Sequence, residues 1–309
     1  MKSKYKKNLI SLVIAIISAV TFCYLSEAKL KSNEQSDEKE LLTDITHINI
    51  TGRIAKNIEA VEKLVKEKRP KAIYIEQWIL AEKGNENLAQ KLHKIAHKNE
   101  AKFYLFVGRD NWFGRRGLVN VLAALDQYGN DIDGIVLKTQ PNKTNIWKNS
   151  TDFQAQLLNQ MLDAYSAIHT EAKRRNKLFI ADFPFWFSDY NGPKKSFSEN
   201  VCDYTDKVIF LIDDLTKLKS LNINWNDITC LYSIDLTKHA TQLSDDDVSD
   251  MYKTIKSKLT FYSNFNGFIV DSSSNIDFKE LEKQAENTSK EQFDDSSDAK
   301  PIKNVPENK

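Results

Sequence analysis

Polar side chains that could bind or cleave a substrate directly follow several apolar segments of this chain. In the segment 131–141, strand-like alternation places Lys138 and Gln140 on the same side as the apolar Val136. A lysine and a glutamine on the inward side of a strand need polar partners, because burying them unpaired is costly. The ends of the other apolar segments supply candidates for such partners, namely Glu76, Gln77, Arg109, Asp110, Asp182, Asp213, Asp214, Asp235 and Asp271.

Carboxylates in such a group could perform acid–base chemistry on a glycoside. Hydrolysis of a glycosidic bond ordinarily uses one carboxylic acid and a second carboxylate. The residues that we interpret as candidate catalytic carboxylates are Asp182, Glu76 and Asp235. Lys138 could instead form a structural salt bridge with Asp182 or Asp213, which would make that carboxyl group a poorer acid.

Tryptophans stand at or just beyond the same segment ends. Aromatic faces beside carboxylates and amides suit sugar rings, whose C–H faces stack while their hydroxyls form hydrogen bonds. A single tryptophan is better explained as a core or loop anchor, so the argument depends on the whole group of Trp78, Trp112, Trp147 and Trp186. The residues that we predict to bind a substrate are Gln140, Lys138, Trp78, Arg109, Trp112, Trp186, Asp213 and Asp271.

Alternating strand and helix patterns must position these residues. Between the apolar segments, apolar residues recur at helical spacing, as in the long helix expected over about 151–174, with Phe153, Leu157 and Met161 on one side. Eight strand–helix units predict a single-domain α/β protein, a (β/α)8 TIM barrel, whose site lies at the carboxyl ends of the strands. An open doubly wound sheet is the alternative, but no glycine-rich dinucleotide loop follows the first strand. The expected strands are 46–50, 71–78, 102–108, 131–141, 178–186, 207–214, 228–236 and 266–272.

The N-terminal segment of the chain predicts export. Lysines precede an apolar run from Leu9 to Leu25, and small residues follow, so residues 1–28 are expected to be a signal peptide or a membrane anchor. A polar linker at 29–44, a barrel domain at 45–286 and a disordered tail at 287–309 would follow. The protein would then be periplasmic, extracellular or anchored facing outward, with membrane contact only through its N-terminal segment.

The net charge, the cysteines and the histidine spacing bear on which ligands and partners the protein could bind. A formal net charge of +1 gives no argument for nucleic acid binding. Cys202 and Cys230 could form a disulfide in an oxidising compartment, or remain buried thiols. His93 and His97 have metal-compatible spacing on an expected helix, but without an evident third ligand we interpret them as part of a solvated face. We therefore predict no metal and no cofactor.

The 131–141 segment resembles the fourth strand of chitinase-like glycoside hydrolases and related barrel hydrolases. That strand reads D-G-x-D-x-D-x-E, or D-G-I-H-L-D-x-E-P in the related enzymes, and Asp133, Gly134 and Pro141 fit it. The acidic positions are occupied here by Val136, Lys138 and Gln140. The resemblance implies that Gln140 stands where the family has its proton-donating glutamate. A glutamine amide can form a hydrogen bond with a glycosidic oxygen but cannot protonate it.

Three further segments extend the resemblance. The sequence 182–186, Asp-Phe-Pro-Phe-Trp, is similar to the fifth strand of the related hydrolases, and 208–213 is similar to the sixth strand of chitinases. Asp213 would then take the place of an aspartate that follows a tyrosine in the family, with Ile212 replacing that tyrosine. The eighth strand ends in Asp271 and serines where the family has a tryptophan.

Three functional hypotheses follow from the sequence. The first is an exported, glycoside-hydrolase-like barrel that binds a glycan or polysaccharide and lacks the usual catalytic acid. The second is an active glycoside hydrolase that uses the displaced carboxylates named above. The third is a non-catalytic structural protein of the cell envelope.

Overall fold

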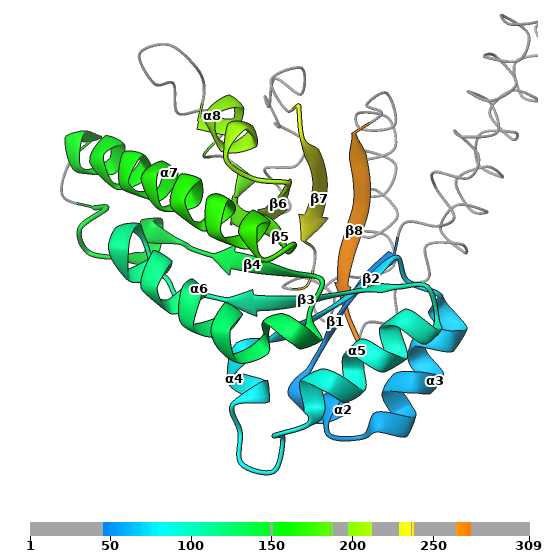
Figure 1. The fold of residues 1–309 in the computed structure, drawn as a ribbon. Helices are drawn as coiled ribbons and strands as arrows, with labels where there is room; N and C mark the ends of the chain where they lie inside the picture. The colour runs from blue at the N-terminus through cyan, green and yellow to red at the C-terminus, as the bar shows by residue number, and fades with distance from the viewer. Residues whose placement is uncertain are drawn as a thin grey trace, which may run out of the picture. The chain divides into compact units, whose positions relative to one another are not determined.

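Eight parallel strands close into a barrel in the computed structural model (Figure 1), which describes residues 46–148, 151–185, 187, 197–211, 229–235, 237 and 264–272. Each strand pairs with the next, and the eighth pairs in parallel with the first. The expected TIM barrel is therefore confirmed. Its strands are β1 Thr46–Ile50, β2 Ala72–Glu76, β3 Lys102–Val107, β4 Gly134–Lys138, β5 Leu178–Pro184, β6 Lys207–Leu211, β7 Leu231–Asp235 and β8 Phe265–Asp271.

From β1 to β6, helices connect consecutive strands and pack outside the barrel, as the pairs α3–α5 and α6–α7 show in Figure 1. Local sequence explains their ends: the Asn57 side chain caps α3 by accepting from the Ala60 amide, and Arg69 before Pro70 ends it in a left-handed conformation. The helical segments are α2 Gly52–Ala55, α3 Ile58–Lys68, α4 Gln77–Leu80, α5 Leu88–Lys98, α6 Gly114–Tyr128, η1 Gly129–Asp131, η2 Pro141–Lys143, α7 Thr151–Arg174 and α8 Phe197–Asp203.

The observed elements correct three expectations. The second strand ends at Glu76 and not at Trp78, because Gln77 already begins the short helix α4. The long loop expected between the fifth and sixth strands contains α8. Phe153, expected on the buried side of α7, is exposed, whereas Leu157 and Met161 on that helix are buried.

The barrel interior is filled by alternate residues of the strands, as a parallel barrel requires. Aromatic and branched side chains from six strands form one cluster there. Val136 belongs to it, which confirms the predicted inward face of the fourth strand. The members of the cluster are Ala72, Tyr74, Tyr104, Phe106, Val136, Ile180, Ile209 and Ile269.

A disulfide joins Cys202 in α8 to Cys230, the residue before β7, so the pairing left open by the sequence is formed in the structure. Within the described residues, no helix combines the length and the apolar character that a bilayer crossing requires. The expected export segment 1–28, the linker 29–44 and the tail 287–309 lie outside the described residues, as do Trp186, Asp213 and Asp214.

Candidate functional site

Four charged side chains meet at the carboxyl end of the barrel. Lys138 is the last residue of β4, and its Nζ lies 3.7 Å from Glu76 Oε1, 4.0 Å from Asp182 Oδ2 and 3.8 Å from Asp235 Oδ2. Glu76 ends β2 and Asp235 ends β7, while Asp182 is paired with Lys138 across β4 and β5. These four residues are called the Lys138 cluster below. The structure thus brings together the three carboxylates predicted as catalytic and the lysine predicted beside them.

Packing below and beside Lys138 directs its side chain into the barrel. Val136, two residues earlier on the same strand, lies in the interior cluster, and the Lys138 ammonium lies 5.0 Å from the centre of the Phe106 ring. Gly108 follows β3 with φ +137°, and a Cβ at this position would lie 2.1 Å from the Lys138 carbonyl oxygen. A glycine is therefore needed for β3 and β4 to approach each other at this point.

The Lys138 cluster contains three carboxyl groups and one cation in a largely dry setting. Asp182 and Asp235 are completely buried, whereas the side chains of Lys138 and Glu76 are 24% and 27% exposed. Burial by itself would lower the pKa of Lys138, but the nearby Asp182, Asp235 and Glu76 outweigh burial and raise that pKa above its ordinary value. Burial raises the pKa of Glu76, the charge of Asp235 adds to this, and Lys138 opposes it.

These electrostatics define what the cluster can do chemically. A lysine held charged by carboxylates is a poor nucleophile near neutral pH, so Schiff-base chemistry at Lys138 is disfavoured. Glu76 is partly exposed and has a raised pKa, so it is the carboxyl group best placed to carry a proton to a ligand. Because each of these carboxylate oxygens lies within 4.0 Å of the same ammonium, any two of them are at most about 8 Å apart. This limit admits the separation of about 5–5.5 Å in retaining glycosidases and the shorter separations in inverting ones.

Residues beside the cluster add polar groups at the same level. The Thr237 amide donates to Asp235 Oδ1, which fixes that carboxylate at the end of β7. Asn49 on β1 is aligned with Asp271 on β8, and its buried Oδ1 has no hydrogen-bond partner within the described part of the chain. The sequence interpretation missed Asn49, although alternation from the inward-facing His47 could have indicated it.

The predicted aromatic residues differ widely in exposure. Trp78 is 59% exposed at the start of α4, and its ring lies over Gly52, where a Cβ would be 3.5 Å from the indole edge. Trp112 is half-buried, with the Arg109 guanidinium 6.0 Å from its ring centre. Trp147, in the segment that follows η2, is buried and stacks on Phe187 at 5.2 Å, so it offers no open face to a sugar.

The remaining predicted binding residues have mixed outcomes. Gln140 is only 3% exposed, so the structure places its amide within the packed wall beyond β4. Asp271 ends β8 and is half-buried. Trp186 and Asp213 lie outside the described residues, so their roles stay predictions.

Comparison with known proteins finds no family and only distant structural likenesses. No family model and no curated protein matches the chain. Similar solved structures include the orotidine 5'-monophosphate decarboxylase of Methanocaldococcus jannaschii, with 11% identity, a TM-score of 0.46, and coverage of 79% of this chain and 98% of that one. The C-terminal domain of a Desulfitobacterium hafniense DCB-2 protein assigned as a chitinase has 12% identity, a TM-score of 0.41, and coverage of 63% and 66%.

An agarase is also similar, with 13% identity, a TM-score of 0.43, and coverage of 70% of this chain and 42% of the agarase chain. Decarboxylases and glycoside hydrolases thus stand side by side among these structures. Likenesses at this level carry no information about the reaction or the ligand of the present chain, so function is argued from the site.

Proposed function

We propose that this protein is a glycoside-hydrolase-like barrel that binds a glycan at the carboxyl ends of its strands. The observation that carries the proposal is the Lys138 cluster, in which Lys138 stands at a strand-four position that is acidic in the hydrolases whose motif the chain resembles. Lys138 and Glu76 are each about a quarter exposed and offer a donor and an acceptor to sugar hydroxyls. Charged groups of this kind are retained at the mouth of a barrel at a cost in stability, which favours a role in ligand binding.

Trp78 supports a sugar ligand in particular. It directly follows Gln77 and lies two residues beyond Glu76, and more than half of its surface is open to solvent. An exposed indole near charged hydrogen-bonding groups supplies the apolar face on which a pyranose ring stacks. The edge of this indole packs over Gly52, two residues after β1 ends.

Binding without the usual hydrolysis follows from strand four itself. The position at which the resembling hydrolases have their acid is Gln140, which has no proton to give and is buried. We infer that Gln140→Glu alone does not restore chitin-type hydrolysis, because Val136 and Lys138 also depart from the motif. Robust turnover of a chitooligosaccharide by that single variant would contradict this inference.

The test is a glycan-array measurement on the full chain, followed by a reducing-end assay on every glycan that binds. We expect binding without release, and we expect Trp78→Ala to weaken it by about tenfold or more. Leu231→Ala is the matched control, because Leu231 is an exposed apolar residue at the first position of β7, the other end of the barrel. Absence of binding to any glycan would overturn the proposal.

An active hydrolase is the second candidate, and the raised pKa of Glu76 favours it. Glu76 would protonate the leaving group while Asp235 or Asp182 acts as the second carboxylate within about 8 Å. In that case reducing ends would be released, and Glu76→Gln would abolish release while leaving glycan binding in place. Release that survives this substitution would exclude Glu76 as the acid.

We also propose that the protein is exported. The disulfide Cys202–Cys230 supports this, because such bonds persist in oxidising compartments. The basic start and apolar run of residues 1–28 support it independently. Mass spectrometry of the mature protein should find an N-terminus at Lys29, whereas a full-length chain with reduced cysteines would contradict export.

A further inference from the structure

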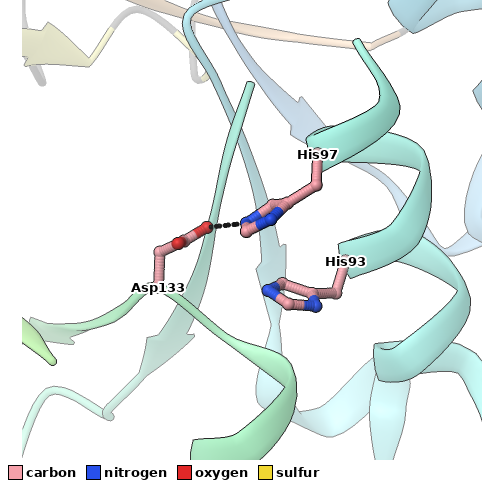
Figure 2. A group of neighbouring side chains, drawn as sticks. All are labelled: His93, His97 and Asp133. Carbon is pink, nitrogen blue, oxygen red and sulfur yellow. Dashed lines mark hydrogen bonds and ion pairs between the residues drawn. The ribbon is translucent and has the colours of Figure 1, made fainter. Parts of the chain in front are cut away.

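A second group of chemistry-bearing side chains lies on the outside of the barrel wall, at the opposite end of β4 from Lys138. His93 and His97 project from α5 toward Asp133, the residue before β4 (Figure 2). One nitrogen from each histidine and one oxygen from Asp133 all lie within 4.8 Å of one another. His97 Nε2 and Asp133 Oδ2 are 2.9 Å apart and share a hydrogen bond.

Helix spacing and strand pairing bring the three residues together. Residues four apart on α5 share one face of the helix, and the two imidazole rings lie 4.0 Å apart at their centres. Asp133 is fixed from the other side, because its Oδ2 accepts the Phe103 amide at 2.8 Å and its own amide donates to the Phe103 carbonyl oxygen. The absence of an evident third ligand in the sequence is thus corrected, since Asp133 lies 36 residues beyond His97 and reaches it only through the fold.

We propose that His93, His97 and Asp133 bind a divalent transition-metal ion, of which Zn²⁺ is the best match. Two imidazole nitrogens and one carboxylate oxygen are ligands that Zn²⁺ prefers, and water would take the fourth tetrahedral position. The ion would replace the hydrogen that now joins His97 to Asp133. Bond lengths of about 2.0 Å place tetrahedral ligands about 3.3 Å apart, so the side chains need only small rotations from their present positions.

The surroundings support the site and limit its affinity. The Phe103 amide orients the Asp133 carboxylate in the way that a second shell orients a metal ligand. Lys102 Nζ lies 3.5 Å from Asp133 Oδ1 and would compete with the ion for that carboxylate. Lys177 lies nearby, but its ammonium donates to the Ile132 carbonyl oxygen at 2.7 Å. Asp131 contributes a further negative charge next to His93.

The chain contains its own matched control two strands further along. Asp206 precedes β6 as Asp133 precedes β4, its Oδ2 accepts the Phe179 amide at 2.8 Å, and His169 of α7 lies 3.4 Å from its Oδ1. The residue four positions before His169 is the buried Tyr165, so no second imidazole shares its helix face there. This pair can link a helix to a strand, but it offers one ligand fewer to an ion.

The ion would act as a clamp between α5 and β4. Metal that binds only the folded chain stabilises it in proportion to the logarithm of ion concentration over its dissociation constant. Asp133 precedes the first residue of β4, and Lys138 is its last residue. The metal site therefore lies at the opposite end of the strand from the Lys138 cluster. The inference is therefore independent of the proposed glycan binding.

The test is a titration of the full chain, without a histidine tag, with Zn²⁺ by calorimetry and with Co²⁺ by absorption. We expect one ion per chain, the visible bands of tetrahedral Co²⁺, and a melting temperature that rises with Zn²⁺. Loss of one ligand in His93→Ala should weaken binding by about 100-fold or more, since changes in the second shell alone cost about 10- to 100-fold. Lys102→Met should tighten binding, because it removes the competing ammonium.

His169→Ala and His239→Ala provide the controls. The first removes a histidine–aspartate contact equivalent to that of His97, and the second removes a histidine outside the described residues. Both should bind Zn²⁺ and Co²⁺ as the wild type does. Absence of binding at millimolar Zn²⁺, or affinity that is unchanged in His93→Ala, would overturn the proposal and leave His97–Asp133 as a structural hydrogen bond.

Discussion

Polar side chains inside the barrel have different kinds of partner at its two ends. At the carboxyl end, three carboxyl groups surround the single ammonium of Lys138. At the amino end, the buried His47 forms hydrogen bonds with the Tyr74 hydroxyl at 3.0 Å and the Asn266 carbonyl oxygen at 2.9 Å. Lys207 at that end lies 5.5 Å from the Tyr104 ring centre and donates to its hydroxyl. One end therefore gathers opposite charges, while the other satisfies polar groups mainly with neutral partners.

The difference supports the proposal that the ligand binds at the carboxyl end. Replacing a buried ion cluster by well-packed apolar residues is often neutral or stabilising, so such a cluster is weak evidence for a stabilising role. Hydrogen bonds between neutral buried groups carry no comparable cost of desolvating charge. The charged end is also the end at which TIM barrels place their sites. The comparison predicts that substitutions at the two ends differ in size and in pH dependence.

The largest effect is expected for Lys138→Met, which removes the only cation of the cluster. Asp182 and Asp235 would remain buried without it, and the free energy of unfolding should fall by about 3–5 kcal/mol near neutral pH. Acidification should reduce the loss, because protonated carboxyl groups need no counter-ion. Urea unfolding at several pH values measures both expectations.

Lys56→Met is the matched control for that substitution. Lys56 forms an ion pair with Glu82 at 2.9 Å, but its side chain is 61% exposed. Exposed pairs contribute less than about 1 kcal/mol, so its loss should be small. If Lys138→Met were no more destabilising than this control, the buried carboxylates would not depend on Lys138 as their counter-ion.

Much of the fold could be predicted from the sequence because barrel strands are short, apolar and separated by periodic helices. The first strand and the long helix α7 have the predicted bounds. Gln77 misled the prediction because apolar residues continue through 78–80 in a helix and not in a strand. Apolar runs of this length are compatible with either element, so only the fold decides between them.

The site could be predicted in part, for a physical reason. Alternation along one strand places Lys138 inward, and the carboxyl ends of parallel strands converge, so Glu76, Asp182 and Asp235 were expected near it. Sequence does not give side-chain packing across elements, and this is why the burial of Trp147 against Phe187 could not be predicted. For the same reason, the sequence did not predict that Asp133 lies beside His93 and His97.

A smaller effect is expected at the amino end for His47→Gln. Burial lowers the pKa of His47 to about 3, with the charge of Lys207 adding to this and the bond to Asn266 opposing it. The unfolded chain therefore takes up a proton below pH 6.5, whereas the folded chain does not do so until about pH 3. This difference lowers wild-type stability by up to about 1.4 kcal/mol for each pH unit below 6.5.

The substitution should remove that part of the pH dependence, at the cost of a constant loss from the weakened hydrogen bonds. Urea midpoints of the variant and the wild type, compared at neutral pH and one unit below 6.5, measure the change in slope. His169→Gln is the control, since His169 lies on the outer helix α7 and is not buried. A slope that is the same in His47→Gln and the wild type would show that His47 takes up its proton at the same pH in the folded and the unfolded chain.

The smallest effect on stability is expected for Glu76→Gln. Its pH dependence has the opposite sign to that of His47, so it distinguishes the two ends of the barrel. Burial raises the pKa of Glu76 above 4.5, so the folded chain holds this proton at a higher pH than the unfolded chain. Wild-type stability then decreases as pH rises from 4.5 through the folded-state pKa, the opposite of the His47 contribution. Glutamine does not titrate, so the variant should gain stability relative to the wild type across that range, as measured by urea unfolding. It also leaves two carboxylates for one ammonium and brings the cluster closer to neutrality. A stability difference that is constant with pH would instead mean that Lys138 compensates Glu76 fully, and the carboxyl end would then be as well balanced as the amino end.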